Sequence, residues 1–229
     1  MEEIFEFRWG VNPSGYSLKN FDAEENGKLS LISDAQGQAV LGPNDPDRDL
    51  EFYTPDEKVK FLHREFASLG PTDEAAIKFV SEYGVLGQTG ISEQQFDSVS
   101  GGQIVPDFFD AQRKVKLVMD MLKSDKRTNA EASIAFNKNC SARMTMLIDP
   151  TKPKRPVAKI IPTTLLSFIW LKVSEDIIGG IIWKKCKYSS CTNHFPVGKG
   201  AGTKRREFCH NTNCKIYWHR QNQKEQGNG

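Results

Sequence analysis

Four cysteines in the last fifth of the chain constrain its fold more than any other feature. They form two pairs with the same spacing, Cys-x4-Cys, at Cys186/Cys191 and Cys209/Cys214, and 17 residues separate the pairs. This arrangement is typical of a tetrahedral four-thiolate zinc site, in which each pair supplies two ligands from a short turn. A segment of this length has little core of its own. Metal binding would therefore supply much of its folding free energy, on the order of 10 kcal/mol.

Two other states of these thiols are open at this point, free buried thiols and two disulfides. Disulfides form mainly in exported proteins, which fold in an oxidising compartment. The N-terminus MEEIFEFRWG does not resemble a signal peptide for export, because acidic residues precede its apolar ones. We therefore expect a cytoplasmic protein with one structural zinc ion. Four thiolate ligands leave no position for a catalytic water. Three histidines near the pairs are weaker candidates for a metal ligand: His194, His210 and His219. The isolated Cys140 is expected to be a small core residue.

Charge is unevenly distributed along the chain. The net charge of +2 combines −10 over residues 1–126, +4 over residues 127–182 and +8 over residues 183–229. The basic segment favours a polyanionic partner, although a solvated charged surface without a partner has the same composition. The guanidinium group of arginine can donate two hydrogen bonds to one phosphate group, and glycines let backbone amides approach phosphate closely. The candidate nucleic-acid contacts are Lys199, Lys204, Arg205, Arg206, Lys215 and Arg220.

Some of these side chains have a structural alternative. Arg206 can pair with an acid of the preceding domain, such as Asp176, instead of binding phosphate. Tyr217 and Trp218 can stack on bases, or one of them can pack over the zinc-binding turns.

The pattern of apolar residues predicts an α+β protein that is mainly helical with a few short strands. Helices are expected over 54–70, 72–84, 106–123, 129–138 and 164–178, several with N-terminal capping residues and an apolar stripe. Strands are expected over 3–9, 28–33, 142–148 and 181–185, and a loop over 10–27. His63 is expected at the surface of the first helix. The longest weakly polar run, 160–171, is too short for a membrane span, which needs about 20 residues.

These elements predict an acidic, mostly helical body over residues 1–180 and a basic zinc module over 181–224. Gly179-Gly180 would end the last helix of the body and mark the boundary. The polar residues 225–229 are expected to form a flexible tail.

The basic module resembles the CGNR zinc finger of bacteria. The resemblance rests on the two Cys-x4-Cys pairs, on Phe195, on Arg205-Arg206 before Cys209, and on the basic helix that follows. In that family the finger lies behind a mostly helical ABATE-type domain, in proteins described as stress-induced transcription regulators. The resemblance implies a structural zinc ion and DNA binding. This chain departs from the family at its eponymous motif, because Cys-Gly-Asn-Arg is replaced by Cys214-Lys-Ile-Tyr.

Together these features favour a zinc-binding transcription regulator. Its finger would contact duplex DNA, while the body senses a small-molecule effector or forms a homodimer. The alternative is an RNA- or protein-binding module with a purely structural zinc ion. We expect no enzymatic activity, because the sequence has no nucleophile elbow, no HExxH motif and no dinucleotide-binding motif.

Overall fold

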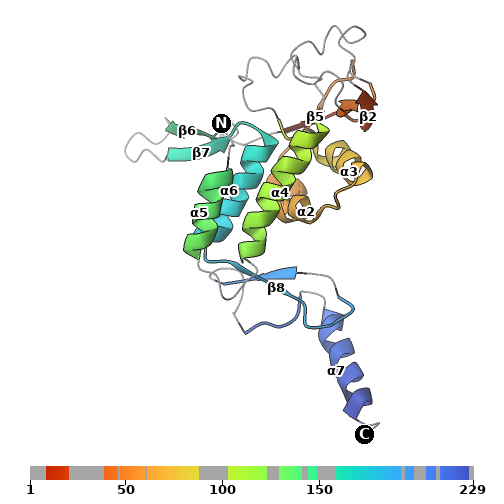
Figure 1. The fold of residues 1–229 in the computed structure, drawn as a ribbon, viewed down its shortest axis with the longest axis vertical. Coiled ribbons are helices and arrows are strands. Elements are labelled where there is room, and N and C mark those ends of the chain that lie inside the picture. Colours follow the sequence, from red (N-terminus) through yellow and green to blue (C-terminus); the bar gives the residue numbers. More distant parts are fainter. Residues whose placement is uncertain are drawn as a thin grey trace. The chain divides into compact units, whose positions relative to one another are not determined.

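The computed structural model describes the chain in segments. These are residues 9–20, 39–45, 47–59, 61–87, 103–122, 129–140, 144–148, 158–191, 194–198, 205–209 and 212–226. Within them the chain has helices and short antiparallel strands (Figure 1). Four cysteines cluster near the C-terminus. The predicted α+β class is therefore confirmed. None of the helices in these segments is long and apolar enough to cross a membrane.

The chain divides into two compact units. The first comprises Met1–Lys116 and Asn139–Lys172, and the second comprises Leu117–Lys138 and Val173–Gly229. The second unit therefore contains the four clustered cysteines, together with helical residues within 117–138 and 173–178. The predicted boundary at residue 180 lies inside this unit.

The strands of the first unit form three small antiparallel sheets. β1 (Trp9–Val11) pairs with β4 (Glu51–Tyr53), and β3 (Ala39–Pro43) lies between β2 (Tyr16–Asn20) and β5 (Gln103–Ile104). The third sheet pairs β6 (Met144–Ile148) with β7 (Ala158–Pro162). The predicted loop over 10–27 is wrong where β2 forms. Neither β2 nor β3 has a strict alternation of polar and apolar residues, and each finds its partner far away in the sequence.

Other strand predictions have mixed outcomes. The strand expected over 142–148 is confirmed as β6, although residues 142–143 lie outside the described segments. Of the strand expected over 3–9, only Trp9 is described, at the start of β1. The expected strand over 28–33 lies outside the described part of the chain.

The predicted helix over 54–70 is two helices, α1 (Pro55–Lys58) and α2 (Leu62–Ser68). Thr54 has the extended backbone of an N-cap, but its side chain makes no capping hydrogen bond. Helix α1 ends at Lys58, and the backbone of the next residue, Val59, is extended. The ammonium group of Lys58 donates to the carbonyl oxygen of Glu82 and lies 4.6 Å from the ring centroid of Tyr53.

This break changes the environment of His63. The prediction that His63 lies at the surface is wrong, since only 2% of the residue is exposed. It lies in the first turn of α2, between the buried Leu62 and the buried Phe66.

The core of the first unit is built on three phenylalanines from three helices. Phe66 of α2, Phe79 of α3 (Asp73–Tyr83) and Phe108 of α4 (Val105–Leu122) have ring centroids 5.1 to 5.8 Å apart. Gln112 of α4 donates to the carbonyl oxygens of Ala67 and Leu69, which fixes α4 against the end of α2. The apolar stripes of α3 and α4 are therefore core residues, as expected.

Helix α6 (Leu165–Ile178) begins with a reciprocal cap. The hydroxyl of Thr164 accepts from the Ser167 amide at 3.0 Å, and the hydroxyl of Ser167 accepts from the Thr164 amide at 2.8 Å. Thr164 is therefore the N-cap of the helix that the sequence predicts over 164–178. The same role is played at α3 by Thr72, whose hydroxyl accepts from the Ala75 amide.

Removing the Thr164 hydroxyl should destabilise the first unit. In Thr164→Ala the Ser167 amide loses its acceptor in a buried site, and we expect a loss of about 1 kcal/mol in the free energy of unfolding. Thr164→Ser keeps the hydroxyl and is the matched control. Urea unfolding followed by circular dichroism measures both, and equal losses in the two variants would contradict the cap.

In the second unit, α6 ends in a Schellman motif. The amide of Ile181 donates to the carbonyl oxygen of Asp176, and that of Gly180 donates to Ile177. Gly180 has φ = +61°, which favours glycine. Gly179-Gly180 therefore ends the helix, as predicted.

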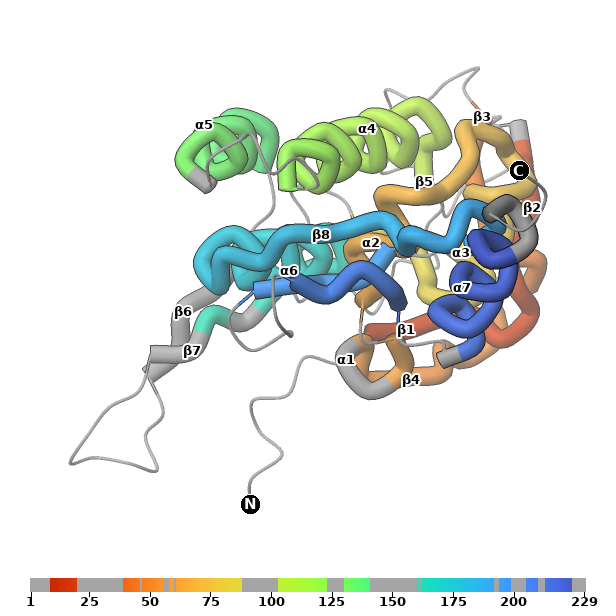
Figure 2. Tube along the Cα trace, turned by 90° about the horizontal axis from the view of Figure 1, so that it is seen from below, coloured from red at the N-terminus to blue at the C-terminus, as the bar shows by residue number. Residues whose placement is uncertain are grey.

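The chain then enters an antiparallel hairpin of β8 (Ile182–Lys185) and β9 (His194–Val197), which Figure 2 shows side by side. The unit also contains α5 (Asn129–Asn139) up to residue 138, and α7 (Thr212–Gln226). The strand expected over 181–185 and the helix expected over 129–138 are confirmed. Residues 225–226 of the predicted tail belong to α7.

Candidate metal centre

Four separate pieces of backbone position the cysteines. Cys186 directly follows β8, and Cys191 ends a tight turn in which its amide donates to the carbonyl oxygen of Tyr188. Cys209 precedes α7, and Cys214 lies in the first turn of that helix. A backbone hydrogen bond from the Lys187 amide to Glu207 joins the two turns.

The four sulfur atoms form one cluster with the dimensions of a metal site. All of them lie within 4.8 Å of one another, with 3.8 Å between the Sγ atoms of Cys191 and Cys209 and 3.6 Å between those of Cys209 and Cys214. A tetrahedron with zinc–sulfur bonds of about 2.3 Å has edges of about 3.8 Å. No cysteine forms a disulfide. The four cysteines can therefore hold a metal ion.

The surroundings of the sulfur atoms fit a soft or borderline metal cation. Cys186, Cys191 and Cys214 are buried and Cys209 is half-buried, and Tyr188 and Phe208 pack against them. Burial, together with hydrogen bonds that its protonated thiol shares with the other three cysteines, raises the pKa of Cys214 to about 12. A metal ion would reverse this effect, because its charge stabilises the thiolates. Thiolate sulfur is a ligand that selects zinc, copper(I) or iron–sulfur clusters over magnesium or calcium.

No other residue type joins the cluster within the described segments. Of the three histidines near the cysteines, His194 lies on β9 and His219 is exposed on α7. His210 lies outside the described residues. Cys140 follows α5, and it too is outside the cluster.

A layer of side chains connects α7 to the turns around the sulfur atoms. The ammonium group of Lys187 lies 3.0 Å from a carboxylate oxygen of Glu207 and 4.6 Å from the ring centroid of Trp218. Trp218 also meets Phe208 edge-on at 5.7 Å. The exposed Lys187–Glu207 pair adds little stability by itself. The aromatic contacts hold α7 in one orientation.

Arg206 is used inside the module. Its Nε atom donates to the carbonyl oxygen of Phe208 at 2.8 Å, and its guanidinium lies over the ring of Phe195 at 5.0 Å. Asp176, which the sequence suggests as an alternative partner, accepts from Trp183 Nε1 at 2.7 Å. The contacts of Arg206 therefore give it a structural role in the turn before Cys209.

The other predicted nucleic-acid contacts fall into two groups. Arg205, Lys215 and Arg220 are exposed. Lys199 and Lys204 lie outside the described residues. The structure thus brings together all four predicted metal ligands and leaves three of the predicted cations at the surface.

Tyr217 and Trp218 differ in the way that the sequence left open. Trp218 is half-buried, because it packs against Phe208 and Lys187 near the cysteines. Tyr217 is 47% exposed, and its ring centroid lies 5.9 Å from that of Tyr188. Sequence reasoning missed Tyr188, Phe208 and Glu207 as supports of the site. Their position within a few residues of a cysteine is the signal that points to them.

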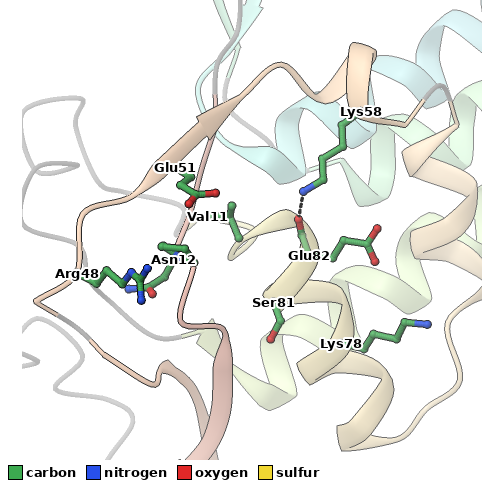
Figure 3. A pocket seen from close by; sticks show the side chains of 9 residues that line it. Val11, Asn12, Arg48, Glu51, Lys58, Lys78, Ser81 and Glu82 are labelled. Atoms are coloured by element: carbon green, nitrogen blue, oxygen red, sulfur yellow. Dashed lines mark hydrogen bonds between the residues drawn. The ribbon is translucent and has the colours of Figure 1, made fainter.

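A separate hollow lies in the first unit, with a volume of about 650 Å³ (Figure 3). Its floor includes Asn12, whose side chain donates to Asp45 and accepts from Ser14. Charges of both signs surround it, and most of the charged side chains are exposed. The residues that line it are Val11, Asn12, Pro13, Arg48, Glu51, Lys58, Lys78, Ser81 and Glu82.

No protein-family model matches this chain, and neither a curated protein nor a solved structure shows significant similarity to it. The metal centre is therefore argued from its own geometry.

Proposed function

We propose that this chain is a zinc-dependent DNA-binding regulator in which the finger around the four cysteines contacts the nucleic acid. The cluster of four thiols carries the proposal, because its edges of 3.6 and 3.8 Å fit a tetrahedral zinc ion. The metal would be structural, since all four of its ligands come from the protein. Its task would be to fix the two turns and the start of α7.

Charge supports a nucleic-acid partner. The segment 183–229 carries +8, and its exposed cations include Arg205 before Cys209 and Lys215 and Arg220 on α7. Residues 1–126 carry −10 and would repel phosphate, which restricts binding to the finger. The resemblance to the bacterial CGNR finger points in the same direction. The alternative remains an RNA- or protein-binding module with a structural zinc ion.

Salt dependence tests the proposal directly. If Arg205 and Lys215 each neutralise one phosphate, the logarithm of the binding constant for duplex DNA should fall with the logarithm of salt at a slope of about −2. Arg205→Ala should weaken binding to every sequence and reduce that slope by about 1. Fluorescence anisotropy with labelled duplexes measures both.

The matched control removes the same charge from the first unit. Arg113 is exposed on α4 and pairs with Asp110, so Arg113→Ala should leave the affinity and the slope unchanged. Zinc-loaded protein without affinity for any nucleic acid at low salt would contradict the proposal. Tight binding to RNA with none to duplex DNA would favour the alternative.

A further inference from the structure

One side of helix α7 is anchored to the cysteine cluster and its surroundings. Cys214 belongs to the thiol cluster, and Trp218, one turn later, contacts Phe208 and Lys187. Both residues lie on the same side of the helix, because side chains four positions apart nearly align. The metal centre and its aromatic layer therefore determine which side of α7 faces outward.

The outward side carries residues that can read base pairs. At about 100° per residue, Ile216, Arg220 and Gln223 lie opposite Cys214 and Trp218. Arg220 and Gln223 are exposed, and Ile216 is 48% exposed although it is a large apolar residue. Arginine pairs with guanine and glutamine with adenine through two hydrogen bonds each, and an apolar side chain contacts the methyl group of thymine.

The two flanks of the same helix suit phosphate. Lys215 lies on one flank and Tyr217 on the other, and both are exposed. Tyr217 is supported by Tyr188, which itself packs on the cysteines. A cation and a phenolic hydroxyl on opposite flanks can contact the two phosphate backbones that border a groove. The helix is about 22 Å long, and the major groove of about 12 Å admits a helix.

We infer that α7 enters the major groove of duplex DNA, with Ile216, Arg220 and Gln223 toward the base edges and Lys215 and Tyr217 toward the phosphates. This inference rests on the proposed function and assigns the residues that give it sequence specificity. Charge complementarity favours DNA as the partner of the outward side of α7, because residues 183–229 carry a net charge of +8. The exposed Ile216 and Tyr217 lie between the cations Lys215 and Arg220 in the sequence of the helix.

The test uses the full-length, zinc-loaded protein and a library of random duplexes. Repeated selection should enrich a short sequence, and the enriched duplex should bind more tightly than a scrambled one. Arg220→Ala should lower this ratio of affinities about tenfold, because one bidentate base contact is lost. Lys215→Ala should weaken both duplexes by the same factor and leave the ratio unchanged. Zinc content and circular dichroism should be the same in both variants.

Three results would overturn the inference. Binding to duplexes without any enriched sequence would remove sequence reading while leaving the proposed function intact. An unchanged ratio in both Arg220→Ala and Gln223→Ala would place the specificity elsewhere. Tighter binding to single strands than to the enriched duplex would exclude the groove. A complete absence of nucleic-acid binding would instead refute the proposed function itself.

Discussion

Replacing Cys209 by serine should abolish stoichiometric zinc binding and unfold the turns around the metal site. Wild-type protein should contain about one zinc ion per chain, with zinc–sulfur distances near 2.3 Å. The variant should contain little or none after dialysis. Elemental analysis gives the stoichiometry, and hydrogen exchange should show lost protection in residues 186–191 and 205–214.

The size of this effect follows from how little else holds these residues together. Tyr188 and Phe208 are the apolar side chains that pack on the cysteines, and both are only partly buried. Structural zinc contributes on the order of 10 kcal/mol to small domains, more than two such side chains supply. Because zinc displaces protons from the thiols, zinc affinity should also fall as the pH is lowered.

Cys140 provides the matched control. It forms no disulfide and lies outside the cluster, so Cys140→Ser removes one thiol without removing a ligand. Its zinc content should equal that of the wild type. Cobalt substitution adds a second readout, since thiolate-to-cobalt charge-transfer bands should weaken in Cys209→Ser alone. Equal zinc content in all three proteins would falsify the four-cysteine site.

The metal site could be predicted from the sequence because its determinants are local. Each pair of cysteines lies in one turn, so the spacing alone indicates which atoms meet. The cap at Thr72 and the end of α6 at Gly180 could be predicted for the same reason, since each depends on residues within one turn of the helix.

Other features depend on partners that are distant in the sequence. Strand β2 pairs with β3, 19 to 27 residues later. Only residues 16–19 of β2 alternate between apolar and polar residues, which is too short a pattern to predict the strand, and β3 does not alternate. The break after Lys58 depends on Tyr53 and Glu82. The sequence suggests a structural alternative for Arg206 but does not identify Phe195 and the carbonyl oxygen of Phe208 as its partners, because these contacts become visible only in the folded turn.

Trp183→Ala should destabilise the second unit by about 3–5 kcal/mol, the range for removing a large buried aromatic side chain. Only 1% of Trp183 is exposed, and it lies on β8 three residues before Cys186. Its Nε1 atom donates to the Asp176 carboxylate in the last turns of α6. Urea unfolding of the zinc-loaded protein measures the loss. Zinc affinity should fall as well, because metal binding to this unit is coupled to its folding.

Trp183→Phe separates packing from hydrogen bonding. It keeps an aromatic ring on β8 and removes only the donor to Asp176, so the expected loss is smaller, about 1–3 kcal/mol. The decisive readout is hydrogen exchange in residues 173–178 of α6. If β8 and the end of α6 share one core, Trp183→Ala and zinc chelation should each lower protection there. Protection that survives both treatments would mean that the finger folds independently, with its boundary at residue 180 as the sequence predicts.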